Sequence, residues 1–154
     1  MSYNCQLIER EEQTVLSIRT HAAVKDIPTV LGRAYGAIAQ YLEEHGESAS
    51  GAPFTGYYNM DMQNLDLEIG FPVASKLTGR GEIQSGHIPG GKVAATIYTG
   101  PYNAIEPAYN ALTAYIQENE YKPTGVAYEF YLNDPGETPA EELQTQIAFP
   151  LQDT

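Results

Sequence analysis

Apolar residues recur at intervals of three and four in two stretches of the chain, a spacing typical of amphipathic helices that cover a core. The first stripe consists of Leu31, Ala34, Tyr35, Ile38, Tyr41 and Leu42. The second consists of Ile105, Ala108, Tyr109, Leu112, Tyr115 and Ile116. We expect the first helix to start after Asp26, before Pro28, and to stop at Gly46. Asn103 and Glu106 have the spacing of a capping box for the second helix.

Strand-like segments surround both stripes. Residues 15–20 and 93–98 precede the helices, and extended stretches at 52–59 and 126–133 follow them. In the last strand of each half, residues alternate between the two faces of the strand. One face is formed by Leu65, Leu67, Ile69 and Phe71 in the first half and by Leu143, Thr145, Ile147 and Phe149 in the second. The pattern in each half therefore predicts the order strand, helix, strand, strand.

The two halves also match residue by residue. Residues 34–59 align without a gap to residues 108–133, and 8 of the 26 positions are identical. Ordinary composition gives roughly one or two identities by chance. The identical pairs are Ala34/Ala108, Tyr35/Tyr109, Ala37/Ala111, Tyr41/Tyr115, Glu44/Glu118, Gly51/Gly125, Tyr57/Tyr131 and Asn59/Asn133. We predict one domain over 1–154, with repeat one at about 1–74, a Gly-rich linker at about 75–91 and repeat two at about 92–151.

The predicted fold class is α+β. Two pseudosymmetric modules form an antiparallel sheet, with the helices on one face and a ligand cleft between the modules on the other. The first repeat carries five more residues between its first strand and its helix, since Thr20 to Ala34 is 14 steps and Thr99 to Ala108 is 9. The pattern leaves open whether these residues lengthen a loop or the helix.

The strand around Glu129 carries the candidate chemistry. Its apolar set is Val126, Tyr128, Phe130 and Leu132, which we expect to lie under the helices. Glu129 and Tyr131 then lie on the opposite face. The repeat puts Thr55 and Tyr57 at the equivalent positions, and we expect Glu68 on that same face, one strand over. Thr55 in the first repeat corresponds to Glu129 in the second.

A carboxylate among tyrosine rings suits a flat or lipophilic cation, since each ring adds roughly 0.5–2 kcal/mol of cation–π attraction. The same carboxylate can serve as a general base when burial raises its pKa, with a tyrosine hydroxyl polarising an electrophile. Ordinary packing also explains a single tyrosine, because tyrosine favours strands. A solvated strand face equally explains Glu68 beside Asp66.

Charge narrows the choice of partners. The chain has 20 acidic and 8 basic residues, a net charge of −12, which disfavours nucleic acids and anionic membranes and concentrates cationic small molecules. The acidity also serves solubility. Cys5 is the only cysteine, and His21, His45 and His87 lack ligand spacing, so we expect no metal and no cofactor. Without a signal sequence or a membrane-spanning run, we expect a cytoplasmic protein.

Several motifs are similar to the GyrI-like effector-binding domains, the ligand-binding modules attached to AraC-type and MerR-type multidrug regulators. They lie at 93–102 (Val-Ala-Ala-Thr-Ile-Tyr-Thr-Gly-Pro-Tyr), 108–112 (Ala-Tyr-Asn-Ala-Leu), 128–135 (Tyr-Glu-Phe-Tyr-Leu-Asn-Asp-Pro), 139–147 and 149–151. The likeness covers nearly the whole chain and is most specific in 91–151. It implies two strand-helix-strand-strand modules and a pocket between them for bulky, often cationic aromatic compounds.

In that resemblance Glu129 lies at the centre of the pocket, and Tyr131 and Tyr57 form its walls. The family often has histidine at the position of Tyr98 and tryptophan at that of Tyr115, so Tyr98 is a further candidate. The sequence lacks the DNA-binding segment of the family's regulators, so no direct nucleic-acid partner is expected.

Three functions follow. The first is a small-molecule binding module that acts as a drug sensor, sink or adaptor, with ligand-binding residues Glu129, Tyr131, Tyr57, Thr55, Glu68 and Tyr98. The second is a hydrolase that opens cyclopropane-containing genotoxins, as some standalone relatives are thought to do, with Glu129 as base and Tyr131 bonded to the substrate's carbonyl oxygen. The third is an interaction with a protein partner, either DNA gyrase, which it would protect, or a separate regulator.

Overall fold

The computed structural model describes residues 3–134 and 136–152, so Pro135 of the motif at 128–135 lies outside them. The chain forms two compact units. The central unit is Glu12–Pro89, and the C-terminal unit joins the residues up to Glu11 to those from Gly90 onward.

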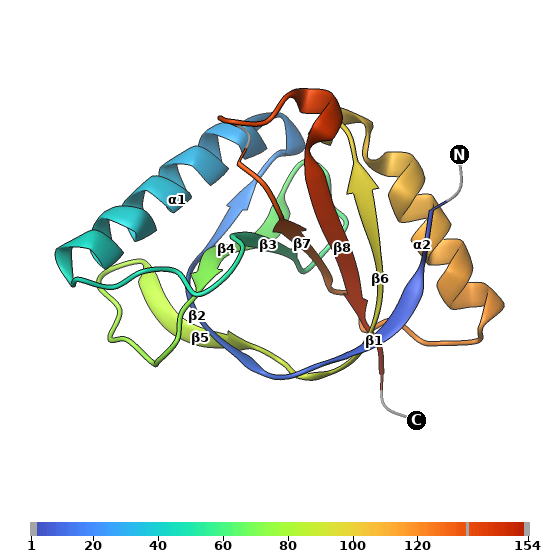
Figure 1. Ribbon diagram of the computed structural model, residues 1–154, viewed down its shortest axis with the longest axis horizontal. Helices are drawn as coiled ribbons and strands as arrows, with labels where there is room; N and C mark the ends of the chain where they lie inside the picture. Colours follow the sequence, from blue (N-terminus) through green and yellow to red (C-terminus); the bar gives the residue numbers. More distant parts are fainter. Residues whose placement is uncertain (1–2, 135, 153–154) are drawn as a thin grey trace. The chain divides into compact units, whose positions relative to one another are not determined.

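The C-terminal unit is a four-stranded antiparallel sheet covered by one helix (Figure 1). Its strands lie in the order β1 (Gln6–Arg10), β6 (Gly91–Thr99), β8 (Gln144–Pro150) and β7 (Ala127–Tyr131). Helix α2 (Glu106–Glu118) follows the 3-10 helix η2 (Tyr102–Ala104), and η3 (Ala140–Glu142) precedes β8. Ala108, Leu112 and Ile116 of α2 are buried against Ala94, Tyr98 and Ile147 of the sheet.

The central unit has the same plan. Its strands lie in the order β5 (Ile83–Ile88), β2 (Gln13–Ala22), β4 (Leu65–Pro72) and β3 (Phe54–Tyr57), again antiparallel. Helix α1 (Ile27–Glu44) follows the 3-10 helix η1 (Val24–Asp26). Ala34, Ile38, Tyr41 and Leu42 of α1 are buried with Leu65, Leu67 and Ile69 of β4, which confirms the apolar face expected for that strand.

The elements expected around the two stripes are present, so the α+β class with antiparallel strands is confirmed. The five extra residues lengthen the helix, because α1 has 18 residues and α2 has 13. Helix α1 stops just before Gly46, which has a φ of 65°. The capping box expected at Asn103 does not form, because that residue belongs to η2 and α2 begins at Glu106 with Pro107 in its first turn.

Two strands were not expected from the sequence. β5 lies inside the segment 75–91 that we expected to be a linker, and β1 lies in the N-terminal segment that pairs with β6 of the C-terminal unit. Both are edge strands, and in β5 only Ile83 and Ile88 are buried. Their sequences therefore lack the alternation that revealed the inner strands. The two repeats and the cleft between them stay predictions.

None of the helices in the described part of the chain combines the length and apolarity needed to cross a bilayer.

Two glycines give a test of the packing. At Gly70 in β4, an added Cβ would lie 2.2 Å from the carbonyl oxygen of Leu16 and 2.8 Å from Cβ of Ser17. At Gly36 in α1, an added Cβ would meet nothing within 4 Å. We expect Gly70→Ala to lower the free energy of unfolding by about 1–3 kcal/mol through overpacking. We expect Gly36→Ala to raise it by about 0.5–1 kcal/mol through helix propensity.

Urea unfolding of both variants beside the wild type measures these changes. A Gly70→Ala protein as stable as the wild type would contradict the close approach of β2 and β4, with Gly36→Ala as the matched control for adding a methyl group.

Candidate functional site

Glu129 lies on the face of its sheet that is covered by helix α2. In the β7–β8 register, Glu129 is opposite Ile147 and Tyr131 is opposite Thr145. Residues directly opposite each other in an antiparallel pair share a face. Ile147 belongs to the apolar cluster under α2. The expectation that Glu129 and Tyr131 face away from the helices is therefore wrong.

The reason is that both faces of β7 are buried. Tyr128 and Phe130, which we expected under the helices, lie on the other face and are each 4% exposed. The guanidinium of Arg10 lies 4.2 Å from the centroid of the Phe130 ring on that face. Because apolar side chains fill both faces, apolarity along the strand does not tell which face the helix covers.

Two tyrosine hydroxyls donate hydrogen bonds to the Glu129 carboxylate. Tyr131 donates to Oε1 at 2.9 Å, from the same strand, and Tyr109 donates to Oε2 from helix α2. Glu129 is 8% exposed. Burial raises the pKa of Glu129, and the two tyrosine donors oppose that shift in pKa because they stabilise the ionised form.

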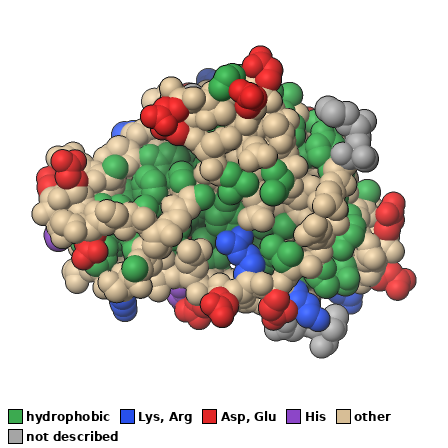
Figure 2. Space-filling view, in the orientation of Figure 1, with side chains coloured by type: hydrophobic (Ala, Val, Ile, Leu, Met, Phe, Trp, Pro, Cys, Tyr) green, Lys and Arg blue, Asp and Glu red, His purple; other side chains and the backbone are tan. Residues whose placement is uncertain are grey.

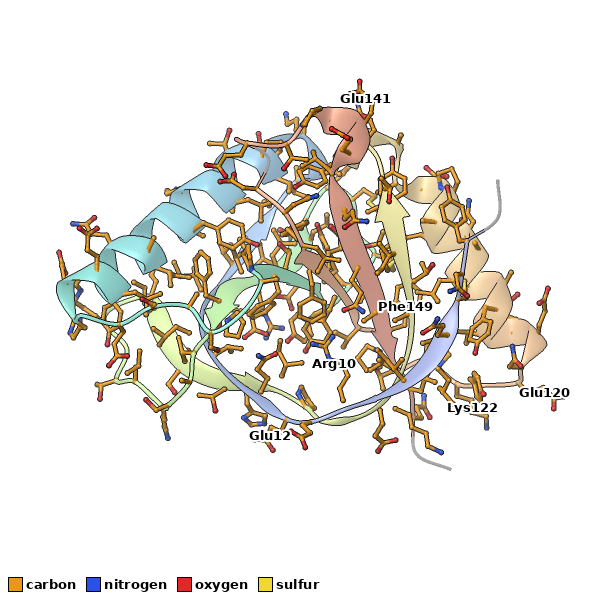
Figure 3. The ribbon with its side chains drawn as sticks, in the orientation of Figure 1. Arg10, Glu12, Glu120, Lys122, Glu141 and Phe149 are labelled. Carbon is orange, nitrogen blue, oxygen red and sulfur yellow. The ribbon has the colours of Figure 1, made fainter. Side chains whose placement is uncertain are left out.

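Further aromatic rings surround these tyrosines. The ring of Tyr102, in η2, meets that of Tyr131 edge-on at 5.5 Å between centroids. Phe149 lies on β8 (Figure 3). The centroid of its ring is 5.7 Å from that of the Tyr109 ring. Burial raises the pKa of Tyr102, with smaller contributions from the charges of Glu129 and Asp134. The carboxylate thus sits in an aromatic environment within one unit.

The central unit makes an equivalent contact with different chemistry. Tyr35 of α1 donates to the carbonyl oxygen of Phe54 at 2.7 Å, and its hydroxyl lies 3.1 Å from Oγ1 of Thr55. Thr55 is opposite Ile69, on the face covered by α1. The pair Tyr35 and Thr55 therefore corresponds to Tyr109 and Glu129, 74 positions later in both members. Tyr57 is half-buried and packs against the same apolar cluster.

Glu68 lies on the opposite face of its sheet from Thr55 and Tyr57. It is opposite Arg19 on β2 and accepts hydrogen bonds from Ser17 at 2.7 Å and Tyr58 at 2.5 Å. The expectation that Glu68 shares their face is wrong, because Glu68 alternates with Leu67 and Ile69, which lie under α1.

Arg19 is held close to this position. It forms a two-pronged ion pair with Asp66 at 2.6 and 2.8 Å and lies 3.8 Å from the centroid of the Tyr58 ring. The hydrogen bond and charge of Arg19 lower the pKa of Asp66.

Tyr98 is fixed within the C-terminal unit. It is 5% exposed, and its hydroxyl donates to the carbonyl oxygen of Pro101 at 2.7 Å. Gly100 leaves the space for that hydroxyl, since an added Cβ there would lie 2.7 Å from it. Tyr98 lies on the face covered by α2, but its hydroxyl is bonded to the backbone rather than to Glu129.

A hollow of about 400 Å³ lies elsewhere, in the central unit beyond the end of α1. Tyr41, His45, Leu77 and Arg80 contribute to its lining, and Arg80 pairs with Glu44 at 2.8 Å. None of the residues expected to bind ligand lines it. Across residues 3–134 and 136–152, no three His, Cys, Asp or Glu side chains lie close enough together to hold a metal.

Sequence reasoning missed Tyr109 and Tyr102 as parts of the surroundings of Glu129 and Tyr131. Tyr109 gave a usable signal, because it belongs to the helical stripe and a buried tyrosine hydroxyl needs a partner. Thr145 was expected on the apolar face of its strand but without a role. Nothing in the sequence marked Tyr102.

The acidic side chains are scattered over the face shown in Figure 2 and form no single patch there. An interaction with gyrase or another protein through an acidic surface stays a prediction.

Solved structures share this fold. The C-terminal domain of EcmrR matches with a TM-score of 0.83 and 22% identity, covering 100% of both chains. EcmrR in a complex with DNA matches with a TM-score of 0.87 and 25% identity over 100% of this chain, which spans 59% of that chain. SAV2435 bound to tetraphenylphosphonium matches with a TM-score of 0.72 and 14% identity, covering 99% of this chain and 94% of that chain.

No curated protein sequence matches the chain. The family described as the GyrI-like small molecule binding domain matches residues 3–152. This range is nearly the whole chain and contains all the motifs that carried the resemblance. The chain therefore belongs to the GyrI-like small-molecule binding domain family.

Proposed function

We propose that this chain binds bulky amphipathic cations, with Glu129 as their charge partner, and that it acts as a drug sensor, sink or adaptor. The observation that carries the proposal is a buried carboxylate that, among the described residues, is held by two neutral groups, the hydroxyls of Tyr109 and Tyr131. No lysine or arginine among the described residues forms an ion pair with it.

Glu129 therefore has no counter-ion in the part of the chain that the structure describes. Burial without an opposite charge disfavours the ionised carboxylate, which is why the pKa of Glu129 is raised. A cationic ligand supplies the missing charge, and the rings of Tyr102, Tyr109 and Tyr131 supply dispersion and cation–π contact of roughly 0.5–2 kcal/mol each. The net charge of −12 raises the local concentration of cations around the protein.

The bound ligand of SAV2435 supports the ligand class. Tetraphenylphosphonium is a permanent lipophilic cation, and SAV2435 has the same fold. It has no hydrogen-bonding group, so its affinity for a protein depends on charge and aromatic contact and not on hydrogen bonds. It is therefore a suitable probe for this chain.

The site is closed by its own tyrosines. Both oxygens of Glu129 already accept a tyrosine hydroxyl, so a ligand that reaches the carboxylate shares or displaces these donors. We leave Glu68 out of the proposed site because it lies on the face of its sheet away from helix α1, and Tyr98 because its hydroxyl is bonded to the backbone of Pro101 rather than to Glu129. Thr55 and Tyr57 stay predicted ligand-binding residues by their place in the repeat.

A binding experiment tests the role of Glu129. We expect Glu129→Gln to weaken tetraphenylphosphonium binding by about 1–3 kcal/mol, or roughly five- to 150-fold in Kd, because it removes a charged partner while keeping the shape. Isothermal titration calorimetry measures the change. Glu68→Gln is the matched control, since Glu68 also accepts two hydroxyl donors but faces away from its helix. Equal effects of the two substitutions would reject the assignment.

The affinity for this probe is also expected to depend on pH. Tetraphenylphosphonium does not titrate, whereas Glu129 must be ionised to pair with it. Because burial raises the pKa of Glu129, affinity falls as the pH is lowered through that raised pKa, by about tenfold per pH unit well below it. The groups around the carboxylate are Tyr109, Tyr131 and Tyr102, with Asp134 near Tyr102. Burial raises the pKa of Tyr102, so its hydroxyl stays protonated over pH 4–8.

The pH dependence of folding stability tests the raised pKa of Glu129 without any ligand. It holds the Glu129 proton more tightly than the unfolded chain, so this residue's contribution to stability is present at low pH and is lost as the pH rises through its folded pKa. The Glu129→Gln variant does not lose this stability as the pH rises, because glutamine does not titrate. Urea unfolding between pH 4 and 8 is expected to show the variant gaining stability relative to the wild type as the pH rises. Parallel pH curves for the two proteins would contradict the raised pKa.

The same geometry favours hydrolysis as a second candidate. A carboxylate with a raised pKa is a competent base, and Tyr131 is within 2.9 Å of it. Glu129 would take a proton from water while the water oxygen bonds to a cyclopropane carbon. The breaking ring bond would send its electron pair to a conjugated carbonyl oxygen, bonded to Tyr131.

Mass spectrometry of a cyclopropane-bearing alkylator incubated with the protein tests this reaction. The product gains the mass of one water, and Glu129→Gln is expected to abolish the gain. No product with the wild type would leave cation binding as the function.

A further inference from the structure

The hydroxyl of Thr145 is buried and has no hydrogen-bond partner. Thr145 lies on β8 and is 0% exposed. In the described part of the chain, its Oγ1 is the one buried side-chain oxygen or nitrogen without a partner. A buried hydroxyl without a partner is costly, so its presence here requires a reason.

Thr145 lies beside Glu129 on the helix-covered face of the sheet. It is opposite Tyr131 on β7 and opposite Tyr98 on β6. Glu129 is opposite Ile147, so Thr145 is its diagonal neighbour, at roughly 7 Å. The hydroxyls of both flanking tyrosines donate elsewhere, Tyr131 to Glu129 and Tyr98 to the carbonyl oxygen of Pro101.

We propose that Thr145 is a second polar anchor of the Glu129 site and that the site is built for protonated amines bearing N–H groups. This inference rests on the proposed function. A primary ammonium group has three donors, so it meets the carboxylate and offers a further hydrogen to an acceptor near it. The hydroxyl of Thr145 accepts that hydrogen. A quaternary ammonium or phosphonium ion has no donor and leaves the hydroxyl unpaired.

Among cationic ligands, the site is therefore expected to prefer amines with N–H groups over quaternary cations. A site that contains a buried hydrogen-bonding group discriminates against ligands that leave the group unpaired. A purely aromatic and ionic box treats an amine and its methylated form alike, apart from size. The Thr145 hydroxyl pairs with an amine N–H but not with the methylated form, so the site is expected to bind the amine more tightly.

A matched pair of cations tests it. The probes are 3,3-diphenylpropylamine, protonated at neutral pH, and its N,N,N-trimethyl derivative, which keeps the charge and the rings but has no N–H. The variants are Thr145→Val, which removes the hydroxyl at similar volume, and Thr145→Ser, which keeps the hydroxyl and removes the methyl group. Calorimetry gives Kd for each combination.

We expect Thr145→Val to weaken amine binding by roughly three- to tenfold, the effect of one hydrogen bond, and to change binding of the trimethyl derivative by less than about twofold. Thr145→Ser is expected to keep the preference for the amine. Equal losses for both cations, or no loss with either, would overturn the inference while leaving the proposed function in place. If the wild type binds neither cation nor tetraphenylphosphonium, the proposed function fails and the inference falls with it.

The stability of the ligand-free variants is an independent readout. Because Val removes an unpaired buried hydroxyl, the Thr145→Val protein is expected to unfold at a urea concentration equal to or above that of the wild type. Thr145→Ser is expected to unfold earlier, since it loses buried apolar volume. A Thr145→Val protein less stable than Thr145→Ser would show that the hydroxyl has a partner within the protein, which would overturn the inference.

Discussion

The candidate site depends on one constraint, the burial of the Glu129 carboxylate under helix α2 with no ion-pair partner among the described residues. Tyr109 and Tyr131 satisfy its oxygens as hydrogen-bond acceptors but bring no positive charge. The raised pKa of Glu129 and the proposal of a cationic ligand both follow from that arrangement. A carboxylate on an exposed strand face would have had water as its partner, and its pairing with a ligand would contribute little.

The central unit shows what the same scaffold does without the charge. There the helix tyrosine, Tyr35, meets Thr55 in place of a carboxylate, and the threonine is buried and satisfied. Both units thus have a contact between a helix tyrosine and a strand residue, but the strand residue is a neutral threonine in one unit and a carboxylate in the other. Tyr35 and Thr55 form a neutral contact, whereas Tyr109 meets a titratable carboxyl group in Glu129. The difference between Thr55 and Glu129, visible in the sequence, is therefore an electrostatic difference between the two units.

Much of the fold could be predicted from the sequence because inner strands and helices carry strong patterns. The alternation in β4 and the stripes of α1 and α2 each reflect one buried face. Edge strands β1 and β5 carry no such pattern, because few of their side chains are buried. For the site, sequence identified Glu129 and Tyr131 but assigned them to the wrong face. Both faces of β7 are buried, so the deciding fact is the register with β8, which depends on contacts distant in sequence.

The charge of the ligand decides which chemistry Glu129 performs. A base must be ionised before it acts, and burial raises the pKa of Glu129. A cationic ligand stabilises the ionised carboxylate as it binds, so binding itself overcomes the effect of burial. A neutral substrate brings no charge, so catalysis depends on the fraction that is already ionised, although a raised pKa strengthens the base once it is formed. In the proposal made here, cation binding therefore supplies its own stabilisation of the ionised carboxylate, whereas base catalysis does not.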